Sequence, residues 1–236
     1  MKREFVQLVR FQDSMTRSNR FVDSPAAPAA VARSGQRAAI VRLSPPNRSD
    51  EEILRALGAG EAWAAAALLD RYGIDVERIL RHILGDDPEL EDLVHDAFAN
   101  ILAAANNVRD PKALRNWIVS VAAHTAHRAI RKRKLTRWIF FWRDEDLPDV
   151  PHEVDLAGRD ALRRTYAALD QLPANERIAF VLRHIEEMPL DDVADACDVS
   201  LATIKRRLNA AEQRFAAMAR RDPVLRSWLE EGRRWI

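Results

Sequence analysis

The sequence predicts an all-α protein made of two small helical domains, joined by a flexible acidic linker and preceded by a disordered N-terminal tail. Apolar residues recur at helical spacing from about Ser49 to Leu135 and again from about Gly158 to Met218, and no strand-like alternation competes with them. The chain has 236 residues, and at about 150 residues per domain this length favours two domains. Hydrophobic residues make up 47% of it, which is enough for a buried core.

The composition argues against several classes of protein. The single Cys cannot form an intramolecular disulfide or a Cys-based zinc cluster, so we expect a reducing compartment and a cytoplasmic location. No apolar run approaches the roughly 20 residues that span a bilayer, and residues 1–12 lack the continuous apolar core of a secretory signal. Secretion, membrane insertion and a disulfide scaffold are therefore disfavoured.

The formal net charge of +1 hides an uneven distribution. Residues 1–48 hold nine Lys or Arg and three acids. Further on, Asp86–Asp96 holds six acids and no Lys or Arg, Arg128–Arg137 holds six bases and no acid, and Asp144–Asp155 again holds six acids and no Lys or Arg. Such blocks are usually solvated faces or tails. Their alternation also fits several charged partners, so the near-neutral sum does not exclude nucleic acid.

The chain is predicted to begin with a basic tail over residues 1–48. Four prolines interrupt this segment and no apolar period persists in it, which is typical of disorder. Ser49 and Glu52 then have the spacing of a capping box, in which each side chain accepts from the backbone amide of the other residue. They predict the start of a first helical domain over residues 49–137.

A helix over Pro88–Leu102 is predicted by an apolar stripe at three-to-four spacing that ends with Ile101 and Leu102. The opposite face of this helix is acidic. It holds Glu91, Asp92, His95 and Asp96. This face is either simply solvated or a docking surface for a basic partner, and the helix taken alone leaves both readings open.

The next helix is predicted to start at Asp110, an N-cap residue followed by a proline in the first turn. It continues into the basic block Arg128–Arg137. Polar and cationic side chains along it suit a strand of nucleic acid, because Lys and Arg neutralise phosphates while amides and imidazoles contact bases. They include Arg109, Lys112, Arg115, Asn116, His124 and His127. The alternative is a solvated helix end whose cations are favoured by the helix dipole.

Two histidines of that helix, His124 and His127, have an i, i+3 spacing that could hold a metal ion. No HExxH-like motif or Cys partner accompanies them, so we expect no metal site. The remaining histidines show no catalytic spacing. We therefore expect no catalytic residue and no cofactor.

Residues 138–157 are predicted to form the linker, since they contain two prolines and no apolar period. The acidic block Asp144–Asp155 lies within this segment. At its start, Trp138–Trp142 is a run of five apolar residues. This run either anchors the linker on the first domain, which we favour, or forms an exposed patch that a partner covers.

The second domain, over residues 158–220, carries the sharpest motif. A short helix over Leu190–Cys197, a three-residue turn and a new helix capped by Ser200 have the layout of a helix-turn-helix. The turn needs a residue that tolerates a left-handed backbone, and Asp198 stands there. The second helix carries donors suited to phosphates and to base edges in a major groove. These donors are Thr203, Lys205, Arg206, Arg207 and Asn209.

The alternative for this segment is an ordinary helical hairpin with a solvated basic face. Beyond it, residues 221–236 are expected to form a C-terminal tail.

Three segments together resemble a known family. Glu91–Phe98 reads EDLVHDAF, Asn116–Ala122 reads NWIVSVA and Ala202–Leu208 reads ATIKRRL. They are similar to the acidic helix, the Trp-containing helix and the recognition helix of bacterial RNA polymerase sigma factors. By this resemblance, Asp86–Leu135 looks like the helical bundle of region 2 and Gly158–Met218 looks like the helix-turn-helix of region 4. The short chain is similar to the extracytoplasmic-function group of the sigma-70 family.

The resemblance implies a non-enzymatic initiation factor that binds core RNA polymerase and directs it to promoter DNA, with an anti-sigma factor as a further partner. The acidic face would dock on the clamp coiled coil of the largest polymerase subunit. The −35 element would be read by Ser200, Thr203, Lys205, Arg206, Arg207 and Asn209. The −10 element would be melted and held by Arg109, Lys112, Arg115, Asn116, Trp117, His124, His127, Arg128, Arg131 and Lys132.

Several positions depart from the family pattern. His95 stands where Gln is usual, Ser120 where Arg is frequent, His124 where Asn is frequent and Ala202 where Gly is usual. The promoter sequence therefore cannot be carried over from relatives.

Two readings from other classes remain. One is a stand-alone helix-turn-helix repressor or activator, and the other is a helical metalloenzyme built on His124 and His127. The acidic docking helix and the acidic linker favour the initiation factor, because a lone regulator needs neither.

Overall fold

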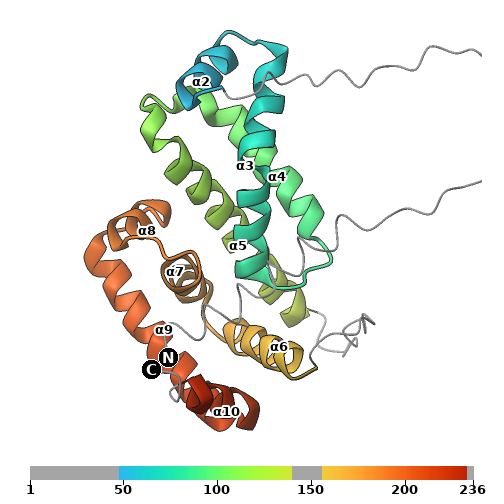
Figure 1. Cartoon of the computed structure of the whole chain (residues 1–236), viewed down its shortest axis with the longest axis vertical. Coiled ribbons are helices and arrows are strands. Elements are labelled where there is room, and N and C mark those ends of the chain that lie inside the picture. Colours follow the sequence, from blue (N-terminus) through green and yellow to red (C-terminus); the bar gives the residue numbers. More distant parts are fainter. Residues whose placement is uncertain (1–47, 140–155, 233–236) are drawn as a thin grey trace, which may run out of the picture.

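The computed structural model describes residues 48–139 and 156–232, and within these ranges all regular secondary structure is helical (Figure 1). The first block comprises α2 (Asp50–Gly58), α3 (Ala62–Leu84), α4 (Leu90–Ala104) and α5 (Leu114–Ile139), with short 3₁₀ turns at Ala105–Asn107 and Pro111–Ala113. The second block comprises α6 (Leu156–Asp170), α7 (Ala174–His184), α8 (Leu190–Ala196), α9 (Leu201–Arg221) and α10 (Pro223–Gly232). The all-α prediction is confirmed.

The predicted helix starts of the first block are present. The Ser49 hydroxyl accepts from the amide of Glu52 at 3.2 Å, and the Glu52 carboxylate accepts from the amide of Ser49 at 2.9 Å, which completes the capping box. The Asp110 carboxylate accepts from the amide of Lys112 at 3.0 Å. The proline that follows begins a single 3₁₀ turn, and α5 proper starts at Leu114.

The first block buries its apolar stripes between α3, α4 and α5. Leu68, Leu80, Ile101 and Leu114 are fully buried there. Leu102 was expected on the buried stripe of α4, but its side chain is 38% exposed. Successive helical residues are about 100° apart, and here Ile101 points into the core while Leu102 lies at the edge of the buried stripe.

The second block ends in a helix where the sequence predicted a tail from residue 221. The Asp222 carboxylate caps α10 by accepting from the amides of Val224 at 2.9 Å and Leu225 at 3.1 Å. Arg164 of α6 donates to the same carboxylate at 3.0 Å, and Leu225 is buried against the rest of the block. The prediction of a tail is therefore wrong for residues 223–232. Asp222 followed by Pro223 is the same local start signal as at Asp110, and it was overlooked here. The ion pair of Asp222 with Arg164 and the burial of Leu225 add contacts with the rest of the block.

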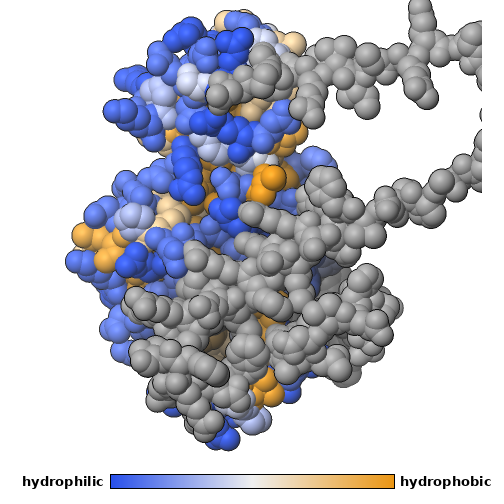
Figure 2. Space-filling model, viewed as in Figure 1, coloured by the Kyte–Doolittle hydropathy of each residue, from blue (hydrophilic) through white to orange (hydrophobic). Residues whose placement is uncertain are grey.

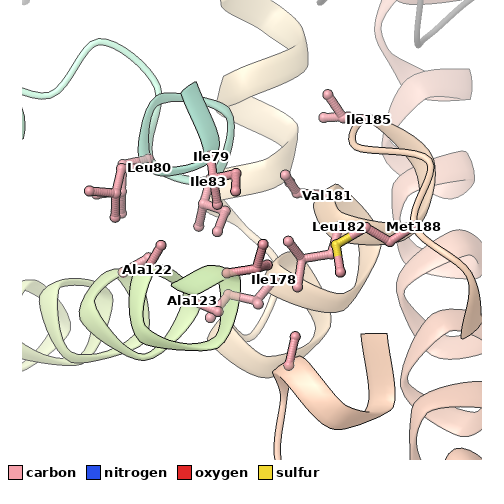
Figure 3. Packing of buried hydrophobic residues seen from close by; sticks show 14 of the residues in the cluster. Ile79, Leu80, Ile83, Ala122, Ala123, Ile178, Val181, Leu182, Ile185 and Met188 are labelled. Atoms are coloured by element: carbon pink, nitrogen blue, oxygen red, sulfur yellow. The ribbon is translucent and has the colours of Figure 1, made fainter. Parts of the chain in front are cut away.

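The two blocks pack directly against each other. Ile79 and Ile83 of α3, Ala123 of α5 and Ile178 and Val181 of α7 all belong to one continuous buried cluster (Figure 3). The sequence predicted two domains on a flexible linker and did not predict this contact. Most of the linker, the residues 1–47 of the expected tail, and most of the Trp138–Trp142 segment lie outside the described residues.

The described surface on the face shown in Figure 2 is mainly hydrophilic, with small apolar patches between charged side chains. Among the described helices, none combines the length and the apolar character required to cross a bilayer.

Candidate nucleic-acid and polymerase interfaces

The segment over α8 and α9 is a helix-turn-helix. Asp198 has a φ of +51°, the left-handed conformation expected for the turn, and the amide of Val199 donates to the carbonyl of Ala194 at 3.0 Å. Ala194 is 4% exposed and Ile204 of α9 is fully buried. Ser200 caps α9 by accepting from the amide of Thr203 at 3.3 Å. The turn at Asp198 and the small side chain of Ala194 together allow α9 to pack closely against α8.

The second helix presents its predicted DNA-contacting residues in two groups. Ser200, Lys205, Arg206 and Asn209 are exposed, whereas Thr203 and Arg207 are only partly exposed. Two positively charged groups and one amide thus stand on the outer face of α9. They have the chemistry needed to contact phosphates and base edges.

The lone thiol in this motif is not a reactive one. Cys197 ends α8 and is partly covered by the packing of the turn. Burial raises the pKa of the Cys197 thiol to about 11, although the positive charge of Arg207 opposes this rise. The nucleophilic thiolate is therefore scarce at neutral pH.

The predicted −10 residues all lie on or just before α5. Most of them are exposed to solvent. The exposed members are Arg109, Lys112, Arg115, His124, Arg128, Arg131 and Lys132. Asn116, Trp117 and His127 are only partly exposed. Asn116 and His127 have partners in the second block, and Trp117 packs against the buried core.

The Asn116 side chain donates a hydrogen bond to the Asp192 carboxylate of α8 at 2.9 Å. The pKa of His127 is lowered, first by burial and then by the charges of Arg131 and His124, with a smaller effect from Arg207 of α9. One stripe of α5 is thus in contact with the helix-turn-helix. Sequence reasoning did not find this.

His124 and His127 do not form a recognisable metal site. The Nδ1 atom of His124 lies 2.8 Å from the Ser120 carbonyl oxygen, to which it donates. Within residues 48–139 and 156–232, no group of three or more His, Cys, Asp or Glu side chains is arranged to hold a metal ion.

The acidic face of α4 projects into solvent. Glu91, Asp92, His95 and Asp96 are all exposed, while Ala97 on the opposite side of α4 is fully buried. The acids that precede α4 are placed differently, because Arg133 of α5 forms ion pairs with Asp87 and Glu89. The predicted docking residues therefore form one outward-facing negative surface. Asp87 and Glu89 instead stabilise the fold through their ion pairs with Arg133.

A second polar cluster was missed from the sequence. Glu186, in the turn after α7, lies 2.6 Å from His82 and 3.1 Å from Arg78, both on α3. Burial disfavours the charged form of Glu186, but the His82 hydrogen bond and the Arg78 charge outweigh it and lower the pKa of Glu186. The partners are 104 and 108 residues apart in the chain, and no local motif marks them.

Family models match both blocks. Sigma-70 region 2 matches residues 68–136 and Sigma-70, region 4 matches residues 162–215. These ranges contain α4 and most of α5 in the first case, and the whole helix-turn-helix in the second.

Two curated RNA polymerase sigma factors are similar in sequence to this chain. The ECF RNA polymerase sigma factor SigX of Bacillus subtilis is 27% identical over 145 residues, which cover 58% of this chain and 74% of the relative. The RNA polymerase sigma-H factor of Pseudomonas aeruginosa is 24% identical over 174 residues, which cover 70% of this chain and 90% of the relative.

Two solved structures share the fold. One is CnrH in complex with the cytosolic domain of CnrY, at a TM-score of 0.53 and 22% identity, covering 73% of this chain and 98% of that chain. The other is the sigma factor RpoE of Bartonella quintana in complex with the anti-sigma factor NepR, at a TM-score of 0.51 and 21% identity, covering 65% of this chain and 95% of that chain.

Both family regions therefore occur in one chain, in the order and on the helices that the sequence predicted. The chain belongs to the sigma-70 family of RNA polymerase sigma factors, in its extracytoplasmic-function group.

Proposed function

We propose that this sigma factor binds core RNA polymerase and directs it to promoters through two DNA-reading surfaces, one for the −10 element and one for the −35 element. Sigma factors are non-enzymatic initiation factors, so the polymerase supplies the chemistry. The observation that carries the proposal is that one chain combines an exposed acidic face on α4 with a helix-turn-helix whose second helix exposes Lys205, Arg206 and Asn209.

The −35 element is assigned to α9. A helix of this kind enters the major groove, where a side chain with several donors distinguishes base pairs by their edges. Lys205 and Arg206 are adjacent on the exposed face, and Ser200 lies at the N-terminus of the helix, where a phosphate is favoured. Arg207, which is partly exposed, is the third cation of α9 that we assign to the −35 element.

The −10 element is assigned to α5 and the segment before it. Its exposed cations lie in two groups, one at and before the start of α5 and one in its basic block, and each group can neutralise phosphates. Trp117 and His127 supply ring faces on which an unpaired base can stack. Melting requires that such unpaired bases be held, so aromatic groups beside cations have the right chemistry.

The acidic face of α4 is assigned to core polymerase. A face with Glu91, Asp92 and Asp96 repels DNA phosphates and attracts a basic protein surface. We place the region 2 domain at residues 49–137 and the region 4 domain at residues 158–220, and we place the protein in the cytoplasm, where polymerase and promoters are found. The solved neighbours are complexes with CnrY and NepR, and an anti-sigma factor is a corresponding partner here.

A single reconstitution tests this function. The purified chain is mixed with core RNA polymerase and fragmented genomic DNA from its source, and the 5′ ends of the transcripts are sequenced. Transcripts that start at defined sites only when the chain is present, with a shared sequence near −10 and −35, are the expected result. If the chain fails to associate with core polymerase but binds duplex operators alone, the stand-alone regulator takes the place of this proposal.

A further inference from the structure

We propose that residues 24–48, which we call the arginine segment, bind the phosphates of duplex DNA next to the −10 element and so strengthen promoter binding by the holoenzyme. This inference rests on the proposed function, because it requires the holoenzyme to be at a promoter. It concerns a part of the chain that the family assignment does not cover, since the match to Sigma-70 region 2 begins at residue 68.

The arginine segment carries only positive charges. Its sequence contains no Asp or Glu and four arginines, which are Arg33, Arg37, Arg42 and Arg48. The guanidinium group offers several donors in a geometry that matches a phosphate. The segment has no Phe, Tyr or Trp on which an unpaired base could stack. Its chemistry therefore suits the phosphates of a duplex better than the bases of a melted strand.

The last residue of the arginine segment is fastened to the first block. Arg48 forms an ion pair with Glu52 at 3.1 Å, and its guanidinium carbon lies 5.4 Å from the centroid of the Trp63 ring. Arg71 of α3 donates to the Arg48 carbonyl at 3.1 Å and forms an ion pair with Asp50 at 2.7 Å. These contacts fix the point at which the segment joins α2.

This attachment point lies close to the start of the surface assigned to the −10 element. The helix α2, at one end of the first block, packs against the 3₁₀ turns at Ala105–Asn107 and Pro111–Ala113 (Figure 1). Arg109 and Lys112, which are exposed and assigned to the −10 element, belong to this part of the chain. One short helix therefore joins the arginine segment to the end of the first block that faces DNA in our assignment.

The acidic face of α4 is the competing partner within the chain. It exposes Glu91, Asp92 and Asp96. Glu91 lies roughly 20 Å, at about 1.5 Å per residue, from the end of α4 that is near α2. Duplex DNA carries one negative charge per about 1.7 Å of its axis, which is a much denser array than three carboxylates on one helix. Charge complementarity therefore favours DNA.

The length of the arginine segment limits where it can bind. Arg33 is 15 residues before Arg48, so at about 3.3 Å per residue it can lie at most about 50 Å from the attachment point. The −10 and −35 elements are about 25 base pairs apart, which is roughly 85 Å of duplex at about 3.4 Å per pair. The arginine segment can therefore reach duplex beside the −10 element, and the −35 element is beyond its reach.

Charge removal in the full chain tests the DNA contact. One variant combines Arg33→Gln, Arg37→Gln and Arg42→Gln, and the matched control combines Arg33→Lys, Arg37→Lys and Arg42→Lys. Holoenzyme binding to a promoter identified by transcript sequencing is measured over a series of salt concentrations. Because each neutralised phosphate contributes about 0.9 to the slope of log K against log[salt], the glutamine variant should have a slope smaller by about 2–3. The lysine control should keep most of the wild-type slope, and an unchanged slope in the glutamine variant would overturn the proposal.

A photoprobe tests the position of the contact. Ser34→Cys in a Cys197→Ser background provides one thiol for an aryl-azide reagent, and the holoenzyme is illuminated on promoter DNA. We expect cross-links to duplex within about 15 base pairs of the −10 element, because the segment can extend about 50 Å. Cross-links near the −35 element, or only to polymerase subunits or to the chain itself, would contradict this position.

Core polymerase binding by the same variants identifies a different partner. The proposal predicts that the glutamine variant binds core polymerase with wild-type affinity. Tighter binding with an unchanged salt slope would mean that the arginine segment covers the acidic face of α4. Weaker binding with an unchanged salt slope would mean that it contacts polymerase. Either result would replace DNA as its partner.

Failure of this inference is separable from failure of the proposed function. If the wild-type holoenzyme starts no specific transcripts, the proposed function fails. The isolated full chain then decides the inference, because its binding to a duplex without a promoter should weaken in the glutamine variant and not in the lysine control. Equal binding by the two variants would rule out the arginine segment as a DNA contact.

Discussion

The side-chain amide of Asn116 in α5 donates a hydrogen bond of 2.9 Å to the carboxylate of Asp192 in α8. The two residues are 76 positions apart and belong to different family regions. A residue assigned to promoter melting is therefore in contact with the first helix of the motif assigned to the −35 element. The promoter-binding surfaces of this sigma factor are consequently not independent in the isolated chain.

The outer face of α9 predicts a loss of −35 recognition when its donors are removed. Lys205→Ala or Arg206→Ala should reduce promoter binding of the holoenzyme by about 1–3 kcal/mol if the contact is to a base edge. The measurement is holoenzyme binding to a promoter found by transcript sequencing. Arg220→Ala is the control, because Arg220 is exposed at the far end of the same helix. Wild-type binding by both Lys205→Ala and Arg206→Ala would remove α9 from the −35 assignment.

The acidic face of α4 predicts a charge-dependent contact with core polymerase. Asp92→Arg or Asp96→Arg should weaken binding to core polymerase by about 2 kcal/mol or more, because a like-charge contact replaces an attractive one. Both side chains are exposed, so thermal unfolding should be almost unchanged. Asp70→Arg on α3, also exposed, serves as the control. Titration of fluorescently labelled chain with core polymerase measures the effect, and undiminished affinity in both variants would contradict the docking assignment.

The buried Glu186 predicts a pH-dependent contribution to stability. Glu186→Gln replaces the carboxylate that Arg78 and His82 both contact by a neutral amide, and we expect a loss of roughly 1–3 kcal/mol in the free energy of unfolding at neutral pH. Because the folded-state pKa of Glu186 lies below the ordinary value of 4.5, this stabilisation is present above pH 4.5 and is lost as the pH falls through the folded-state pKa. The difference between wild type and Glu186→Gln should therefore shrink in acid.

Denaturant unfolding at a series of pH values measures this difference. Glu212→Gln provides the comparison, since the Glu212 side chain is 40% exposed and its loss should cost less. A gap between wild type and Glu186→Gln that stays constant into acid would rule out the charge of Glu186 as its cause.

The partly covered Cys197 predicts chemical inertness. With its pKa raised to about 11, the thiol should react with iodoacetamide at neutral pH much more slowly than glutathione does. Cys197→Ser should retain promoter binding, because the thiol contributes packing and no charge at neutral pH. Mass spectrometry of the alkylated chain measures the reaction rate of the thiol. Promoter binding by the holoenzyme measures the effect of Cys197→Ser. Fast alkylation or a large loss of binding would point to thiol control.

The sequence by itself determined most of the local structure, since local signals have local causes. Ser49 and Glu52 specify a cap within one turn, Asp198 supplies a left-handed turn residue, and apolar spacing selects the buried face of each helix. The motif residues on α4, α5 and α9 were found in the same way, because each group lies within a few helical turns.

Only the tertiary structure decided which surfaces are covered and which long-range partners meet. Three contacts join residues from distant segments: Glu186 with His82, Arg164 with Asp222, and Asn116 with Asp192. Helical periodicity reports that a face is apolar, but it does not report which other face will bury it. That choice depends on shape, charge and backbone geometry acting together across the whole chain, as at Gly85 and Tyr166, and these exist only once the helices have packed.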